Sequence, residues 1–386
     1  MESVARTMMA MIAKEIGAVS PMDCTELTLT EEQLAGLYKL SKAHDLSHLI
    51  SAALPKSAKG SETAAKFKKQ TVTAVYRYEQ LNYELCEVSD ALEAAGIRSM
   101  ALKGSLIRKY YPEPWMRTSC DIDVLVDESE LDRAIELLCT ELGYTVKGEK
   151  NYHDISLFSE SGVHLELHFN ILENMDGIDG LLSRVWEYAV LQEGKKYTYE
   201  QTAEYLAFHT LAHGYYHFSR GGCGVRTFMD LYLLERYSGY DREKLGQMCA
   251  ESGLSEFYAG AIALCDVWFC GGEHTSLTSR MENFILRGGA YGTHEARVEI
   301  EKGKTEGGAK YLLYRIFMPY SQMRSKYPTL IKHKWLYPFF TVRRWFEMIF
   351  KGKLKRSVRE LKKAGATDAE KRDSIASLMD DLGVKS

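Results

Sequence analysis

The chain lacks several features that would assign it to a familiar class of protein. No run of about eighteen or more apolar residues occurs among its 386 residues, so no transmembrane helix is predicted. Met1–Ile16 mixes apolar and charged side chains, which does not fit a secretory signal. The eight cysteines are scattered without Cys-x-x-Cys spacing, so neither a cysteine zinc site nor a disulfide framework is indicated. We therefore expect a cytoplasmic protein with reduced thiols.

The chain also has no evident internal repeat, and its patterns change along its length. With 45% hydrophobic and 26% charged residues, it can bury a full core and form two or three compact units. The periodicity predicts an α+β protein in which a small mixed sheet is flanked by helical regions. The expected parts are a helical region at 1–96, an α/β core at 97–175, a helical domain at 176–320 that completes a cleft, and a basic aromatic arm and helix at 321–386.

Three helices are predicted by their ends or by their lack of breakers. Thr30–His44 starts at a Thr30 N-cap with Gln33 three residues later, as in a capping box. Ala65–Ala95 reads as one long helix, and Glu128–Leu142 as a helix that Gly143 terminates.

The most informative feature is the pair Asp121 and Asp123 in the run CDIDVLV. Alternate side chains of a strand share a face, so the two carboxylates point the same way. Like charges at that spacing repel, and a bound cation such as Mg²⁺ removes the repulsion. Taken alone, an Asp-x-Asp pair is more often two solvated acids on an edge strand. The residues upstream change that interpretation.

A second short signal precedes the aspartates. Ile97–Leu102 reads as a strand, Lys103, Gly104 and Ser105 as a tight turn, and Leu106–Tyr111 as the start of a helix. A glycine at such a turn lets backbone N–H groups approach an anion, so we expect a phosphate to bind there. Lys103 either neutralises phosphate charge or orients the loop.

The order of strand, Gly-Ser turn, helix, and strand with Asp-x-Asp resembles the nucleotidyltransferase superfamily that includes DNA polymerase β. The resemblance implies that Gly104 and Ser105 hold the phosphates of a nucleoside triphosphate and that Asp121 and Asp123 hold a divalent metal ion. It also implies a third acid on a neighbouring strand. The insert Leu106–Cys120 is longer than the superfamily pattern, and we interpret it as a loop that re-aims the site.

Glu166 is the best candidate for the third acid. It lies in Gly162–Ile171, where apolar residues alternate with His164, Glu166 and His168, a pattern typical of a half-buried strand. An amphipathic surface strand is the alternative interpretation. Leu-Lys-Gly, Arg117, Asp-Ile-Asp and Glu-Leu-His, in that order, resemble a narrower family of uncharacterised nucleotidyltransferases, which implies that Arg117 contributes to the nucleotide site.

Three histidines, His209, His213 and His217, follow one another at intervals of four and so share one face of a helix. The glutamate of a His-Glu-x-x-His zinc site is absent, because residues 210 and 211 are Thr and Leu. Two interpretations remain open: the rings line the cleft, with His213 at the nucleotide, or they pack in the core.

On the following helix, Arg226 and Asp230 are also four residues apart and are predicted to form an intrahelical ion pair. If that helix faces the cleft, Arg226 contacts the triphosphate instead, since arginine offers phosphate a bidentate fork.

Positive charge is concentrated near the C-terminal end. Residues 321–363 contain thirteen basic and two acidic residues, a net charge of +11 in a chain whose total is −4. The same stretch carries eight aromatic residues, among them Trp335, Phe339 and Phe346. Basic residues interleaved with aromatics are typical of a membrane surface contact or a nucleic-acid contact. The third interpretation is a basic arm that covers the acidic body of the same protein. Beyond it, Asp368–Leu382 is predicted to be a short helix.

Together these patterns predict a nucleotidyltransferase that moves a nucleoside monophosphate from a triphosphate, expected to be ATP, to a hydroxyl of a small molecule or protein. Asp121, Asp123 and Glu166 form the predicted catalytic and metal-binding set, with Mg²⁺ or Mn²⁺ as the ion. Two alternatives remain: a non-catalytic nucleotide-binding or partner-binding protein with the same fold, and an enzyme that acts on RNA such as a tRNA end.

Overall fold

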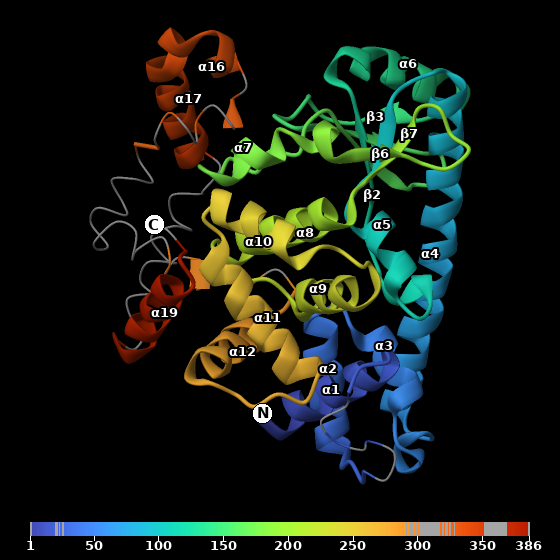
Figure 1. Ribbon diagram of the computed structural model, residues 1–386, viewed down its shortest axis with the longest axis vertical. Coiled ribbons are helices and arrows are strands. Elements are labelled where there is room, and N and C mark those ends of the chain that lie inside the picture. The colour runs from blue at the N-terminus through green and yellow to red at the C-terminus, as the bar shows by residue number, and fades with distance from the viewer. Residues whose placement is uncertain are drawn as a thin grey trace.

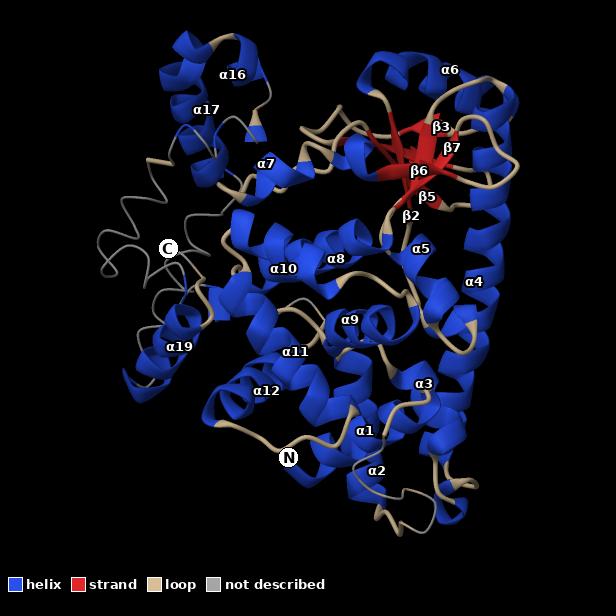
Figure 2. Ribbon diagram, in the orientation of Figure 1, coloured by secondary structure: helices blue, strands red, loops and turns tan. Residues whose placement is uncertain are grey.

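The computed structural model describes residues 2–290 apart from 20, 21, 23, 25 and 26, and then 292, 293, 296, 297, 300, 317, 318, 320, 323, 326, 327, 329–350 and 369–384. In these residues a seven-stranded sheet stands beside a larger body of helices (Figures 1 and 2). The predicted α+β class is confirmed. None of the helices in the described ranges combines the length and the apolar character needed to cross a bilayer.

The N-terminal region is helical, as predicted. It consists of α1 (Glu2–Glu15), α2 (Glu31–Ala43), α3 (Ser47–Ala53), a 3₁₀ turn (Lys56–Ala58) and α4 (Glu62–Ala94). The capping box at α2 is present: the Gln33 N–H donates to the Thr30 hydroxyl at 3.2 Å, and the Thr30 N–H donates to the Gln33 side chain at 2.9 Å. The 33 residues of α4 form a rod roughly 50 Å long.

The α4 rod joins two hydrophobic clusters. Phe67, near its start, is buried in the main cluster with the N-terminal helices. Leu81, Val88 and Leu92, further along, are buried in a second cluster with the sheet and α6. In Figure 1, α4 runs the height of the molecule and passes both the sheet and the N-terminal helices.

The sheet has the strand order β3-β4-β5-β2-β1-β7-β6. β1 is antiparallel to β2 and parallel to β7, β2 is parallel to β5, and the pairs β3–β4, β4–β5 and β6–β7 are antiparallel. Because β2 and β5 are parallel with Asp123 opposite Glu166, the two acids lie side by side on one face. The strands are β1 (Ser99–Ala101), β2 (Ile122–Val126), β3 (Thr145–Val146), β4 (Asp154–Phe158), β5 (His164–His168), β6 (Ala189–Leu191) and β7 (Thr198–Gln201).

The predicted return to helices after Gly177 was wrong in part. α7 (Ile178–Leu182) does follow, but β6 and β7 come next and complete the sheet. The sheet therefore extends beyond the predicted core, 97–175. These strands are only three and four residues long, and β7 is held in place by pairing with β1, about a hundred residues earlier in the chain. Strands that short carry no readable alternation.

The segment between β1 and β2 is a series of short turns. α5 (Gly104–Ile107) starts at the glycine, two residues before the predicted helix start, and gives way to 3₁₀ turns at Arg108–Tyr110 and Pro114–Met116. α6 (Leu131–Glu141) follows a 3₁₀ turn at Glu128–Glu130, and Gly143 has a φ of 68° after its end, as the cap prediction required.

The helical body packs below the sheet in Figure 1. α8 and α9 approach each other closely, because a Cβ on Gly214 would lie 2.5 Å from a methyl carbon of Thr227. The predicted C-terminal helix is confirmed as α19. The helices of this part are α8 (Ala203–Phe218), α9 (Val225–Tyr237), α10 (Arg242–Glu251), α11 (Ser255–Phe269), α12 (Ser276–Gly288), α16 (Thr329–Lys332), α17 (Tyr337–Phe350) and α19 (Ala369–Asp381).

Candidate functional site

A cavity of about 390 Å³ lies where the sheet and the helical body meet, between β2, β5, α5, α8 and α9. Its lining includes all nine residues that the sequence assigned to the site: Lys103, Gly104, Ser105, Arg117, Asp121, Asp123, Glu166, His213 and Arg226. The structure thus brings together residues that are up to 123 positions apart in the chain.

Three carboxylates form the strand side of the cavity. Asp123 is on β2, Glu166 is its direct neighbour on β5, and Asp121 immediately precedes β2. Ligand atoms of Asp123, Glu166 and His168 all lie within 4.8 Å of one another, and the same holds for Asp121, His164 and Glu166. Glu166 belongs to both groups and therefore links them.

His168 bridges two of these acids. Its Nε2 lies 3.0 Å from Asp123 Oδ1 and 3.4 Å from Glu166 Oε2, and its side chain is buried. Burial lowers the pKa of His168, but the hydrogen bonds to Asp123 and Glu166 outweigh it and raise the pKa to about 9. The ring is therefore a cation at neutral pH. The sequence predicted only that His168 flanks Glu166, because its contacts depend on the pairing of β2 with β5.

Asp121 and Asp123 have opposite electrostatic environments. Burial, together with the charges of Asp123 and Glu166, raises the pKa of Asp121 to about 6. Burial also acts to raise the pKa of Asp123, but Lys103 and His168 hold it well below its usual range. Lys103 Nζ lies 3.6 Å from Asp123 Oδ1. Asp123 is a permanent carboxylate, whereas Asp121 holds its proton more tightly.

Lys103 reaches Asp123 from an unfavourable backbone conformation, with φ 42° and ψ −115°. Such a conformation is costly for a residue with a Cβ. Gly104 follows it, and a Cβ there would lie 2.9 Å from Arg117 Nη1. Glycine is therefore required at 104 as long as Arg117 keeps its place.

Arg117 is held by a buried carboxylate. Its Nε lies 3.0 Å from both oxygens of Asp230, and its Nη2 donates to Asp230 Oδ2 at 2.9 Å. The Tyr111 hydroxyl donates to the same carboxylate at 2.6 Å. Asp230 is only 2% exposed. Arg117 thus lines the cavity with its guanidinium fork already engaged.

The predicted pair between Arg226 and Asp230 is wrong. Arg226 pairs with Asp45, in the loop between α2 and α3, and its Nη2 also donates to the Asp45 carbonyl at 3.2 Å. The i,i+4 rule failed because Asp230 faces the core, where Arg117 meets it. Asp45 is 57% exposed, so the Arg226–Asp45 pair is open to solvent. The Arg117–Asp230 pair, in contrast, is buried.

The three histidines of α8 divide between the two interpretations. His213 and His217 line the cavity, whereas His209 is buried and hydrogen-bonded to Gln201. Burial lowers the pKa of His209 to about 3 and that of His217 to about 4. The face they share is therefore part cleft and part core.

Glu173 holds His213 and was not predicted from the sequence. Its Oε1 lies 2.7 Å from His213 Nδ1, while His213 Nε2 lies 3.1 Å from His217 Nε2. Burial acts to raise the pKa of Glu173, but His213 and Lys103 lower it to about 2. Glu173 follows β5 in an irregular segment, so no periodicity marked it.

The donor set of the strand side fits a divalent cation. Carboxylate oxygens are the ligands that Mg²⁺ and Mn²⁺ prefer. Burial first, and then the charges of Asp123 and Glu166, raise the pKa of Asp121, and a bound cation would offset the repulsion between these acids.

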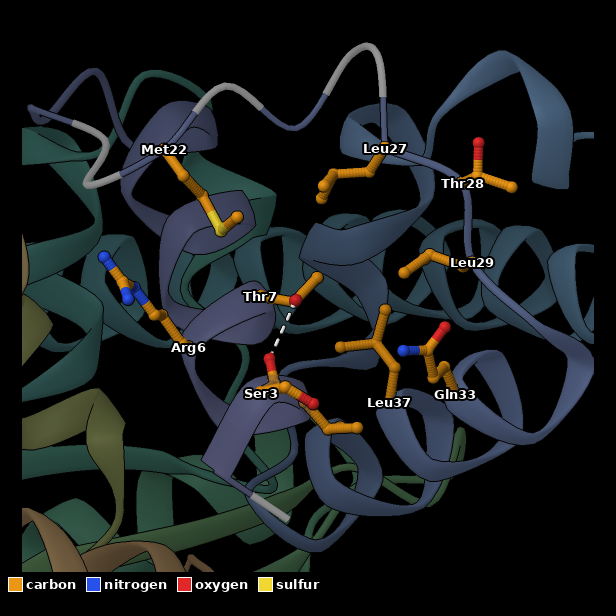
Figure 3. A pocket seen from close by; sticks show the side chains of 10 residues that line it. Ser3, Arg6, Thr7, Met22, Leu27, Thr28, Leu29, Gln33 and Leu37 are labelled. Atoms are coloured by element: carbon orange, nitrogen blue, oxygen red, sulfur yellow. Dashed lines mark hydrogen bonds between the residues drawn. The ribbon is translucent and has the colours of Figure 1, made fainter.

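A second cavity, of about 530 Å³, lies between α1 and α2 and differs in character (Figure 3). Its lining residues are mostly apolar or carry hydroxyl groups. The Thr7 hydroxyl donates a hydrogen bond to the Ser3 carbonyl at 2.8 Å. Arg6 is its charged member, and no carboxylate is among the described lining residues. It therefore lacks the groups that a metal-dependent reaction needs.

Comparison with known proteins gives one result for the family. The profile of a family described as uncharacterised nucleotidyltransferase matches residues 30–270, more than half of the chain. The matched range starts at the cap of α2, ends just after α11, and contains all nine predicted site residues. No curated protein matches the chain.

Proposed function

The chain belongs to this nucleotidyltransferase family, and from that premise we propose that it moves a nucleoside monophosphate from a nucleoside triphosphate to an acceptor hydroxyl. The observation that carries the proposal is the meeting of three carboxylates from paired strands with the Gly-Ser turn in one cavity. ATP is the donor we expect, and the hydroxyl belongs to a small molecule or a protein.

Asp121, Asp123 and Glu166 would hold a divalent cation, Mg²⁺ or Mn²⁺. When bound, the ion supplies positive charge that stabilises the phosphate oxygens as negative charge develops on them. The Asp123 carboxylate stays ionised because Lys103 and His168 favour its charged form. His168 keeps Asp123 and Glu166 close together, and so positions two of the three ligands.

The phosphates would be bound by Lys103, the Gly104–Ser105 turn and Arg226. Gly104 has no side chain, and the space this leaves is filled by the Arg117 guanidinium, which packs against the turn. Arg226 can exchange the exposed Asp45 for a phosphate oxygen, which accepts charge-assisted hydrogen bonds equally well. Arg117, engaged with Asp230, supports the turn from beneath. His213, fixed by Glu173, contacts the nucleotide across the cavity.

The reaction follows from this arrangement. The acceptor oxygen attacks the α-phosphorus, a new P–O bond forms, and the bond to the departing pyrophosphate breaks. The hydroxyl proton passes to the carboxylate of Glu166, which lies beside Asp123 on the paired strand β5.

The test is a transfer assay with each of the four nucleoside triphosphates labelled at the α-phosphate, with Mg²⁺ or Mn²⁺ and a cell extract as the source of acceptor. We expect label to move into a small-molecule or protein fraction. The double variant Asp121→Asn/Asp123→Asn should lower the rate by at least about 10²–10³-fold, because charge stabilisation at the reacting phosphate is lost.

Asp176→Asn is the matched control, since Asp176 is exposed and is not among the residues that line the cavity. Circular dichroism of all variants checks that the fold is kept. Transfer that persists in the double variant would exclude this site as the catalytic centre. Label that enters RNA would instead identify a polynucleotide acceptor.

A further inference from the structure

The described residues between 317 and 350 include a small hydrophobic cluster of their own. Met323, Tyr327, Leu330 and Phe340 are buried together, in a cluster distinct from the two that contain α4. The Tyr320 hydroxyl donates to the Leu330 carbonyl at 2.6 Å. In Figures 1 and 2, α16 and α17 stand at one corner of the molecule, beyond α7 and away from the sheet.

The helix α17 buries one face in this cluster and presents an apolar stripe on another. Phe340 and Arg344 are 8% and 5% exposed. On the stripe, Trp335 just before the helix is 76% exposed, and Phe339, Val342 and Phe346 are 63%, 44% and 57% exposed. These positions are separated by four, three and four residues, so they follow one line along the helix. Four large apolar side chains in one line are uncommon on a water-facing surface.

The stripe lies in the most basic part of the chain. Lys334 and Arg343, next to stripe residues in sequence, are both exposed. In sequence, residues 321–363 carry a net charge of +11, while the whole chain carries −4. A helix with an apolar stripe and basic residues beside it is the arrangement of a segment that lies in the plane of a membrane surface.

We propose that this stripe, defined as Trp335, Phe339, Val342 and Phe346, binds the surface of a lipid bilayer that contains anionic headgroups. The aromatic and aliphatic side chains enter the boundary between headgroups and acyl chains, and the basic residues contact the lipid phosphates. Trp335 is suited to that boundary because its ring is apolar and its N–H is polar. The nucleotidyl transfer site then works close to a membrane surface.

Three other occupants fit the observations less well. A single-stranded nucleic acid stacks its bases on aromatic rings, and Val342 in the middle of the stripe offers no ring for stacking. A second copy of the chain would bring two segments of +11 together, which repel. The acidic body of the same chain fits less well because, in the part of the chain that the structure describes, the four stripe residues keep 44–76% of their surface exposed.

The experiment is co-sedimentation of the full-length protein with extruded vesicles of phosphatidylcholine, with and without phosphatidylserine. We expect binding to the vesicles that contain phosphatidylserine, weaker binding at high salt, and at least about tenfold weaker binding to phosphatidylcholine alone. The variant Phe339→Ser/Phe346→Ser should bind the anionic vesicles at least about tenfold more weakly, because two large apolar side chains no longer enter the boundary.

The matched control is Tyr76→Ser/Tyr83→Ser. These tyrosines lie on α4 with the same spacing of seven and are 69% and 66% exposed. The control should bind vesicles like the parent protein, and both double variants should keep the nucleotidyl transfer rate in solution, so the proposal is separable from the catalytic one.

Equal vesicle binding by the parent protein and the phenylalanine variant would overturn the proposal. So would tight binding to a single-stranded oligonucleotide without binding to anionic vesicles. A concentration-dependent dimer in light scattering that the phenylalanine variant abolishes, together with no vesicle binding, would assign the stripe to a second copy instead.

Discussion

The two sides of the cavity differ in how their acidic and basic groups are paired. On the strand side, Asp121, Asp123 and Glu166 face two cations, Lys103 and His168, so negative charge is in excess. On the helix side each of three acids has its own partner: Asp230 pairs with Arg117, Asp45 pairs with Arg226, and Glu173 contacts His213. The acids of the helix side are therefore paired within the protein, whereas the strand side carries excess negative charge that a cation would offset.

Removing an acid from the helix side should have the largest effect on stability. Asp230→Ala leaves the Arg117 guanidinium buried without its partner, which costs about 3–5 kcal/mol in the free energy of unfolding. Urea denaturation followed by circular dichroism measures this cost.

A double replacement sharpens that result. Arg117→Met/Asp230→Leu removes both charges, and it should recover most of the lost stability because no unpaired charge remains. If Asp230→Ala is as stable as the parent protein, the stability of the helix side does not depend on the pairing of Asp230 with Arg117.

Removing an acid from the strand side should instead increase the stability of the folded protein. The pKa of Asp121 is raised to about 6 in the folded protein from an ordinary value of 3.8, so the folded state loses stability as pH rises through that window. At pH 7 without divalent metal, Asp121→Asn should therefore raise the free energy of unfolding, by about 1–2 kcal/mol. Well below pH 3.8 the difference should vanish, since Asp121 is then protonated in both the folded and the unfolded state.

The measurement is a set of urea titrations between pH 4 and 7, with EDTA present, for Asp121→Asn and for Asp176→Asn as the control. Added Mg²⁺ or Mn²⁺ should reverse the order, because only the parent protein keeps all three carboxylates. An Asp121→Asn variant that is less stable than the parent protein at pH 7 in EDTA would mean that the charge of Asp121 does not destabilise the folded state.

The exposed pair of the helix side should matter least for stability. Arg226→Ala removes a pair with an exposed aspartate, so we expect a loss below about 1 kcal/mol. In the transfer assay the same variant should raise the KM for the triphosphate about tenfold, because one charge-assisted contact to phosphate is lost. Arg184→Ala, which breaks an exposed pair with Glu187 elsewhere, is the control and should change neither quantity by as much.

The strand side could be predicted from the sequence and most of the helix side could not. Asp123 and Glu166 stand in strands whose alternation fixes which face each residue takes, and the Gly-Ser turn is a local signal. The position of each acid can therefore be predicted from the few residues on either side of it. The pairing of β2 with β5 then follows from the resemblance to a known arrangement.

On the helix side, the partners are set by packing between distant segments. Arg117 meets Asp230 across 113 positions, and Glu173 meets His213 across 40. The i,i+4 spacing of Arg226 and Asp230 predicted a weak local pair, and a buried bidentate contact with another element outweighed it. β6 was missed for a similar reason, since pairing to β7 rather than its own sequence defines it.

The backbone at Lys103 has a consequence for how this turn can be altered. A residue with a Cβ at φ 42° and ψ −115° costs the folded state on the order of 1–3 kcal/mol, and glycine would avoid most of that cost. Glycine would also remove the ammonium group that lies 3.6 Å from Asp123. The strain that glycine would relieve is therefore set against the loss of the cation that stabilises the Asp123 carboxylate. The turn marks a position where the two demands on the chain oppose each other.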